Sequence, residues 1–182
     1  MDVLFKLTDK DIGMPEKEVE EYKTRIAARG IILNSEGKVA IQSKSNTEEY
    51  KLIGGGIEEG EEPSEGFKRE VLEETGCEVS IIEKLGIVEE YISFKGAKQI
   101  SHVFVAKVVD DTHLLGLTEK ETVEGADLIW VSLKEAIELI EDSYSKLTSS
   151  TYDKNYDVYR MKFISLRDKK ILEYYISNYK KG

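Results

Sequence analysis

Residues 55–77 read GGIEEGEEPSEGFKREVLEETGC, and this stretch decides how the chain is read. Its second half predicts a helix over residues 64–75, because Pro63 suits a first helical turn and Gly76 suits the position just after the last one. Glu62 is a mediocre N-cap, so the start of this helix is less sharply defined. Just upstream, residues 50–53 predict a short strand that runs into three glycines, residues 54–56.

Three glutamates, Glu70, Glu73 and Glu74, share one face of the predicted helix. At about 100° per residue, Glu73 and Glu74 fall roughly 60° and 40° to either side of Glu70. Like charges at these spacings repel by ~0.2–0.5 kcal/mol per pair, and the end of a helix favours cations instead. A bound divalent cation removes the conflict, since carboxylate oxygens are the ligands that Mg²⁺ prefers. Gly66 lies on the same face, where we expect it to let the glycine loop approach the helix.

The spacing of polar and glycine residues resembles the signature of the Nudix hydrolases, the MutT-type pyrophosphatases. The pattern is Gly55, five residues, Glu61, seven residues, Arg69-Glu70-Val71, one residue, Glu73-Glu74, one residue and Gly76-Cys77. Two positions depart from the family pattern: Cys77 stands where an aliphatic residue is usual, and Ile53 stands where many members have proline. The signature spans 23 residues, and the surrounding order of strands resembles the whole Nudix fold from about residue 25 to 141.

The resemblance implies a role for each matching residue. The implied catalytic residues are Glu70, Glu73, Glu74 and Arg69. The implied metal ligands, for Mg²⁺ or Mn²⁺, are the three glutamates and the Gly54 carbonyl. Many relatives add an acidic residue from a later loop, and here Glu124 is the choice, with Glu121 and Glu119 as fallbacks. The residues with structural roles in the motif are Gly55, Glu61 and Gly76, and Arg69 is expected to pair with Glu61.

The implied reaction is metal-dependent hydrolysis of a diphosphate linkage in a nucleoside diphosphate derivative. Metal ions neutralise the diphosphate and lower the pKa of a bound water, while a carboxylate takes its proton; Glu70 is one candidate. A nucleoside triphosphate, or an oxidised nucleotide, is the leading substrate by elimination. The alternatives are a dinucleoside polyphosphate, weakly suggested by Tyr91, and a nucleotide-binding Nudix sensor without turnover. A sensor would typically have lost a metal carboxylate, and this signature keeps all three.

Composition narrows the partners. Of 182 residues, 40% are hydrophobic and 34% charged, and the net charge is −10. That charge repels polyphosphate backbones, so we expect a small nucleotide substrate and no stable nucleic-acid binding. One cysteine, Cys77, excludes an intrachain disulfide. No signal-peptide core and no apolar run near ~18 residues is present, which predicts a cytoplasmic protein without membrane contact. The sequence leaves a homodimer open.

The remaining pattern predicts an α/β (α+β) fold, in which helices sandwich a mixed β-sheet. Expected strands cover residues 25–33, 38–43, 79–91 with a break near Gly86, 99–109 and 127–131, and a helix covers 133–141. Asn34 to Gly37 predicts a hairpin turn. We divide the chain into an N-terminal extension (1–24), a Nudix domain (25–141) and a tyrosine-rich C-terminal extension (142–182), which is expected to form one or two helices packed on the domain.

Four features outside the signature have competing interpretations. Arg29 interrupts an apolar strand, and the sequence leaves open a substrate phosphate or a structural ion pair as its partner. His102 alternates with apolar residues and is read as a residue at the rim of the core. The tyrosines from Tyr144 to Tyr159 favour core packing or a dimer contact over stacking on a base. Cys77 is read as a packing residue, since nothing basic adjoins it.

Overall fold

The computed structural model describes residues 2–44, 48–111, 126–147 and 155–179. Its centre is a seven-stranded mixed sheet in the order β1-β5-β6-β2-β4-β3-β7. The strands are β1 (Val3–Leu7), β2 (Lys23–Leu33), β3 (Val39–Lys44), β4 (Glu49–Gly56), β5 (Cys77–Ile92), β6 (Ala97–Asp111) and β7 (Ala126–Val131). The helices are α1 (Pro63–Thr75), α3 (Leu133–Lys146) and α4 (Asn155–Tyr179), with short 3₁₀ turns η1 (Asp9–Ile12) and η2 (Ser93–Lys95).

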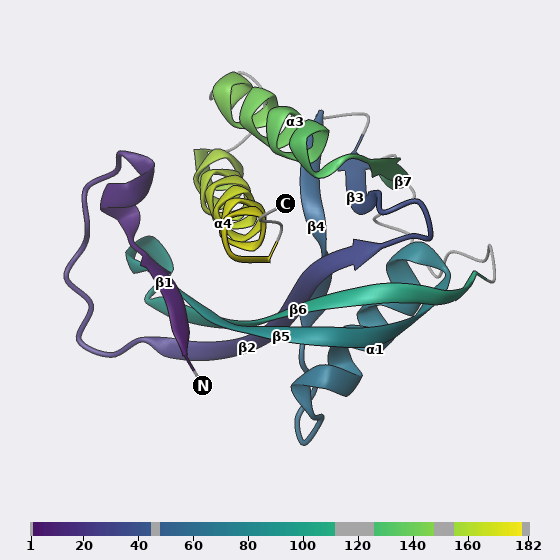
Figure 1. The fold of residues 1–182 in the computed structure, drawn as a ribbon. Helices are drawn as coiled ribbons and strands as arrows, with labels where there is room; N and C mark the ends of the chain where they lie inside the picture. The colour runs from purple at the N-terminus through teal and green to yellow at the C-terminus, as the bar shows by residue number, and fades with distance from the viewer. Residues whose placement is uncertain (1, 45–47, 112–125, 148–154, 180–182) are drawn as a thin grey trace.

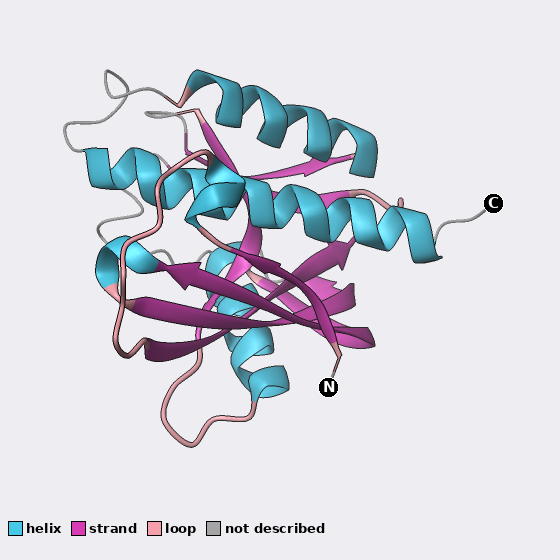
Figure 2. Cartoon of the chain, turned by 90° about the vertical axis from the view of Figure 1, so that its left-hand side faces the viewer, coloured by secondary structure: helices cyan, strands magenta, loops and turns pink. Residues whose placement is uncertain are grey.

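Helices cover both faces of this sheet. Figures 1 and 2 show α1 on one face and the pair α3 and α4 on the other. The pairs β1/β5 and β2/β6 are parallel, and the other neighbours are antiparallel. The expected sandwich of a mixed sheet between helices, with an added C-terminal helix, is confirmed. In the described ranges, none of the helices is both long and apolar enough to cross a membrane.

Alternation along β2 explains how one strand serves two cores. Ala28 and Ile32 pack with Phe67 and Val71 of α1 in one buried cluster. Ile31, one position along, belongs to the cluster that α3 and α4 close from the other side. Successive side chains of a strand point to opposite faces, so β2 is buried on both sides. Arg29 has the parity of Ile31 and therefore lies on the α4 side.

Local signals predicted most of the elements. Asn34 Oδ1 accepts hydrogen bonds from the backbone N–H groups of Glu36 (3.0 Å) and Lys38 (2.9 Å), which stabilises the expected hairpin turn. Helix α1 begins at Pro63 without a side-chain hydrogen bond from Glu62, and it ends at Gly76 with φ 68°. The C-terminal residues form a single helix, α4, of 25 residues.

The N-terminal segment, for which the sequence predicted no strand or helix, contributes β1. Val3–Leu7 pairs in parallel with β5 at the edge of the sheet. Five residues without clean alternation carry little local signal, so only the partner strand defines this element. At the expected break near Gly86, β5 is continuous, but its pairing register with β6 shifts between Lys84 and Gly86. Gly86 itself has a φ of 146°.

Our expectation for Gly66 was wrong. A Cβ at Gly66 would lie 2.5 Å from Cδ1 of Ile57 and 2.7 Å from Oε2 of Glu61. The close approach that this glycine allows is therefore by the loop after β4, and not by glycines 54–56. Helical periodicity places Gly66 on the face of Glu70, but it does not say which part of the chain meets that face.

A buried set of charges fastens α4 to the sheet. Arg167 Nε donates to Asp168 Oδ1 at 2.7 Å, and its Nη1 lies 3.3 Å from Glu90 Oε2 in β5. The other oxygen of Asp168 accepts the backbone N–H of Leu52 in β4 at 2.9 Å. All three charged side chains are at most 2% exposed. Polar contacts across both β4 and β5 therefore fix where α4 lies.

We expect Arg167→Met to destabilise the chain strongly, because it leaves Glu90 and Asp168 buried without their cation. Removing one partner of a buried pair costs about 3–5 kcal/mol. Urea unfolding measures this loss. The matched control is Lys169→Gln, since Lys169 forms a partly exposed pair with Glu141 and such pairs contribute at most about 1 kcal/mol. Equal effects of the two substitutions would contradict the role assigned to Arg167.

Candidate active site

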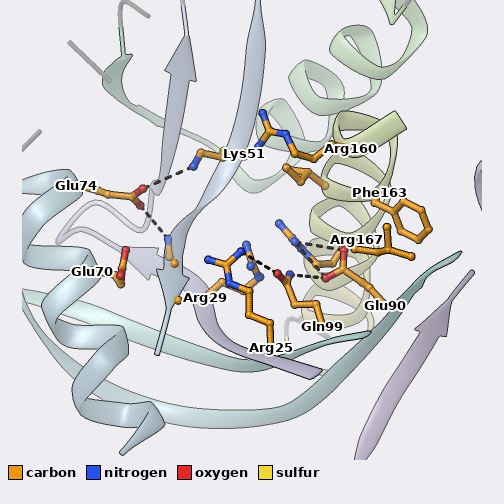
Figure 3. Close-up of a pocket in the computed structure, with 15 residues that line it drawn as sticks. Arg25, Arg29, Lys51, Glu70, Glu74, Glu90, Gln99, Arg160, Phe163 and Arg167 are labelled. Atoms are coloured by element: carbon orange, nitrogen blue, oxygen red, sulfur yellow. Dashed lines mark hydrogen bonds and ion pairs between the residues drawn. The ribbon is translucent and has the colours of Figure 1, made fainter. Parts of the chain in front are cut away.

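One pocket, with a volume of about 440 Å³, lies where β2, β4, α1 and α4 meet. Its wall contains carboxylates from α1 on one side and cations from β2, β4 and α4 on the other (Figure 3). The lining residues are Arg25, Arg29, Lys51, Gly54, Gly55, Gly56, Glu70, Glu74, Glu90, Ile92, Gln99, Arg160, Phe163, Ile164 and Arg167. The structure thus brings four predicted site residues to one cavity: Gly54, Gly55, Glu70 and Glu74.

Glu70 lies against the backbone of β4. A Cβ built at Gly55 would be 2.1 Å from Oε2 of Glu70 and 2.4 Å from its Cδ, far inside contact distance. Only glycine therefore leaves room for this carboxylate to reach the pocket. The sequence motif requires a glycine at position 55, and the structure gives the physical reason.

Glu74 is 8% exposed and is held by donors from the neighbouring strands. Its Oε2 accepts the backbone N–H of Gly54 at 2.9 Å. Its Oε1 lies 3.3 Å from Nε2 of Gln42 and 3.6 Å from Nζ of Lys51. Gly54 itself adopts φ 138°, and a Cβ there would lie 2.2 Å from the carbonyl oxygen of Ala28. A side chain at position 54 is excluded both by backbone conformation and by space.

Arg69 joins the loop after β4 to α1. Its guanidinium forms a two-pronged pair with Glu61, Nε to Oε1 and Nη2 to Oε2, both at 3.0 Å. Nη2 also donates to the carbonyl oxygen of Gly56 at 3.0 Å, and Nη1 donates to Glu70 Oε1 at 2.8 Å. The Glu61 pair raises the pKa of Arg69 and lowers that of Glu61. Arg69 therefore orients Glu70 while it closes the loop.

The third glutamate of the signature lies apart from the pocket. Glu73 is 50% exposed, and its Oε2 is 3.5 Å from Arg69 Nη1. Glu124, with its fallbacks Glu119 and Glu121, lies outside the described residues. Within the described ranges, no group of three His, Cys, Asp or Glu side chains converges closely enough to hold a metal ion by itself.

The carboxylate oxygens of Glu70 and Glu74 nevertheless fit a Mg²⁺ ion that is bound together with a phosphate. Mg²⁺ commonly uses one or two protein carboxylates and completes its shell with water and substrate phosphates. Glu70 and Glu74 supply two carboxylates on one pocket wall, and the absence of a side chain at Gly55 leaves room for the Glu70 carboxylate there.

The cationic wall was mostly missed by sequence reasoning. Arg29 had been singled out, but Arg25, Lys51, Arg160 and Arg167 had not. A usable signal existed for two of them: a spacing of seven residues places Arg160 and Arg167 on one face of a helix. No local pattern, however, connects that face with β2 and β4, because the contact forms only when α4 packs on the sheet.

Three other sequence features have structural answers. Cys77 is buried, and burial raises the pKa of its thiol, as suits a packing residue. Tyr159 is also buried; it donates a hydrogen bond to Asp9 and packs edge-on against Phe163. His102 is partly buried beside the loop of residues 57–61, outside the main pocket, and burial lowers its pKa.

Comparisons with known proteins agree with this geometry. The family model for the NUDIX domain matches residues 23–150. The chain belongs to the Nudix family. The resemblance seen in the signature is thereby confirmed, and the named pyrophosphatases among its relatives support the expected hydrolase class.

Three similar proteins illustrate the range of the Nudix family around this chain. A GDP-mannose pyrophosphatase of Yersinia enterocolitica is 35% identical over 50% of this chain, and the match spans 46% of that enzyme. An RNA pyrophosphohydrolase of Hydrogenovibrio crunogenus is 28% identical over 56% of this chain and 69% of its own length. A Nudix hydrolase structure from Nitrosomonas europaea superposes with a TM-score of 0.52 at 20% identity, over 68% of this chain and 90% of its own, which shows the shared fold.

We predict that Gly55→Ala removes activity while the fold survives. The new methyl group would displace the Glu70 carboxylate, the flexible end of a side chain, and would meet no backbone atom as closely. Hydrolysis of a diphosphate substrate should fall at least about tenfold, a typical lower bound for a misplaced catalytic group. Thermal unfolding of the same variant is the control, and a large drop in its midpoint would mean that the contact disrupts the fold instead.

Proposed function

We propose that this Nudix protein hydrolyses a diphosphate linkage in a nucleoside diphosphate derivative, with Mg²⁺ or Mn²⁺ as cofactor. The observation that carries the proposal is the two-sided pocket, in which Glu70 and Glu74 face three arginines that pair with no carboxylate in the described part of the chain, Arg25, Arg29 and Arg160. The other two cations of the wall, Lys51 and Arg167, already pair with carboxylates. A diphosphate needs both sides: carboxylates to hold its divalent cation and positive charge to bind its oxygens. In a chain of net charge −10, such a local reversal is hard to explain without an anionic ligand.

Glu70 and Glu74 are the proposed metal ligands in the pocket, with Glu73, the Gly54 carbonyl and Glu124 retained from the family pattern. When bound, the metal neutralises phosphate charge and lowers the pKa of a water molecule. Glu70 remains the candidate for accepting the proton of that water, since Arg69 already holds its carboxylate in a fixed direction. Arg69 is proposed to position Glu70 and to act through it.

A nucleoside triphosphate, ordinary or oxidised, is the proposed substrate. The GDP-mannose pyrophosphatases among the relatives make a nucleotide sugar the second candidate. The two differ in charge: the diphosphate of a nucleotide sugar carries about two negative charges, whereas a triphosphate carries about four, because its terminal phosphate ionises twice. The abundance of cations in the pocket favours the triphosphate.

A substrate panel tests the reaction directly. The full chain is incubated with Mg²⁺ or Mn²⁺ and, separately, nucleoside triphosphates, oxidised dGTP, dinucleoside polyphosphates, ADP-ribose and GDP-mannose, and the phosphate products are measured. We expect metal-dependent turnover with the triphosphates hydrolysed fastest. Binding of nucleotides without any turnover would contradict the enzyme proposal and support a sensor.

We further expect Glu74→Gln and Glu73→Gln each to abolish turnover, since an amide carries no charge to hold a metal ion. Glu74→Gln keeps an oxygen for the Gly54 N–H, so the fold should persist. Glu65→Gln is the matched control, because Glu65 lies on the same helix and its ion pair within the described ranges is with Lys68 at the exposed surface. If either signature variant kept its rate within about threefold of the unmodified protein, its assignment as a metal ligand would be wrong.

A further inference from the structure

Arg29 is a buried cation that contacts no carboxylate in the part of the chain that the structure describes. It lines the pocket between α1 and α4 although the residue is only 5% exposed. Its Nε donates to Ser101 Oγ at 3.2 Å, and among the described residues no carboxylate oxygen lies within 4.0 Å of its guanidinium. The structural ion pair that the sequence left open is therefore absent from the described part of the chain. Of the five N–H donors of its guanidinium, the four on Nη1 and Nη2 have no hydrogen-bond partner among the described residues and can meet a ligand.

Three carboxylates, those of Asp168, Glu90 and Glu74, act electrostatically on Arg29, but each is already bound to other groups. Asp168 and Glu90 pair with Arg167, and Glu90 also accepts a hydrogen bond from Gln99 at 2.8 Å. Burial and the positive charge of Arg167 lower the pKa of Arg29 to about 10. A charge that is removed from water without a partner is unfavourable by several kcal/mol unless something else satisfies it. An anionic ligand would satisfy it.

Two further arginines face the same pocket without a carboxylate partner in the described residues. Arg25 of β2 is exposed, and its one side-chain hydrogen bond within the described ranges is to Gln99 Oε1 at 3.5 Å. Arg160 of α4 is also exposed and projects into the pocket opposite the glutamates of α1 (Figure 3). Arginine suits this position, because its planar fork matches the oxygens of a phosphate. The family model ends at residue 150, so α4 adds binding groups from beyond the matched region.

Arg25, Arg29 and Arg160 thus bring three guanidinium groups without a carboxylate partner in the described residues to the wall of one pocket. We propose that Arg29 and Arg160 bind a phosphate group of the substrate other than the one attacked, so that α4 completes the active site and selects nucleotides that end in a free phosphate. This inference rests on the proposed function for the position of the scissile linkage. The anion site itself rests only on the arginines.

The number of arginines that pair with no carboxylate in the described ranges favours this substrate class over a nucleotide sugar. Glu70 and Glu74 offset the two charges of one divalent cation, so the substrate phosphates face the arginines. A sugar-capped diphosphate carries about two negative charges and would leave one of Arg25, Arg29 and Arg160 without a counter-charge. A terminal phosphate adds about two charges and three acceptor oxygens, which matches what these side chains offer.

A metal-free binding experiment tests the anion site. The full chain is titrated with inorganic tripolyphosphate in EDTA, and the dissociation constant is taken from the rise in thermal midpoint with concentration. Arg29→Gln should weaken binding by about 10- to 100-fold, as expected for a lost charge-assisted hydrogen bond, and Arg160→Gln by a smaller factor. Lys162→Gln is the matched control: it removes the same charge from α4, but Lys162 does not line the pocket.

The outcomes are distinct. Affinities within about threefold of the unmodified protein for both arginine variants would overturn the proposal. If Arg29→Gln failed to fold, the Arg160→Gln titration would decide, because an exposed side chain can be replaced without disturbing the core. If Lys162→Gln weakened tripolyphosphate binding as much as the arginine variants do, binding would depend on the overall charge of the protein and not on a specific site. That result would also overturn the proposal.

Kinetics with Mg²⁺ then test the substrate class. Arg29→Gln should lower kcat/KM for a nucleoside triphosphate at least about tenfold, while kcat/KM for GDP-mannose stays within about threefold. An equal loss for both substrates, or a preference of the unmodified protein for GDP-mannose, would overturn the selection of a free phosphate. If the unmodified protein hydrolysed neither compound, the proposed function would fail, while the metal-free titration would still decide the anion site.

Discussion

The close approach of α1 to strand β4 is the constraint on which the site depends. Phe67 and Val71 are buried against β2 and β6, so the rotation of α1 about its axis is fixed by hydrophobic packing. That rotation turns Glu70 and Glu74 toward the glycines of β4, where a side chain at position 54 or 55 would collide with backbone or carboxylate. One short helix therefore supplies core residues on one face and the carboxylates of the site on another.

Arg69 gives this arrangement its rigidity. The loop of residues 57–62 contains several acidic residues and would not by itself lie against an acidic helix. By binding Glu61, the Gly56 carbonyl and Glu70 at once, one guanidinium closes the loop and neutralises part of the repulsion within α1. A planar group with five N–H donors can do this, whereas a lysine could not reach three partners in the required directions.

The pocket inverts the electrostatics of the molecule. A net charge of −10 disfavours a nucleotide in the surrounding solvent, yet the cavity gathers more cations than carboxylates in its wall. Burial strengthens the electrostatic interactions of Arg29, Arg167 and Glu74, because the local dielectric is low. The same low dielectric makes charges expensive to bury, and the pairs around Arg167 show how the fold compensates for that cost while it docks α4.

The amino-acid sequence by itself determined the family, the hairpin after β2 and the limits of α1. It also singled out Glu70 and Glu74, the two carboxylates of α1 that line the pocket. These features depend on residues close together in the chain: a turn at Asn34 to Gly37, Pro63 and Gly76 at the ends of one helix, and a signature confined to 23 residues. Short-range geometry dictates them, so spacing alone is sufficient to read them.

Only the tertiary structure decided that Glu73 lies apart from the pocket, that Val3–Leu7 joins the sheet and that α4 faces the glutamates of α1. The last two depend on partners that are distant in sequence: β5 for the pairing of Val3–Leu7, and Glu90 for the position of Arg167. Arg29 illustrates the difference. Its sequence context marked it as an unusual charge in an apolar strand. Whether a carboxylate contacts Arg29 depends on Arg167, 138 positions away, because Arg167 binds the carboxylates of Asp168 and Glu90.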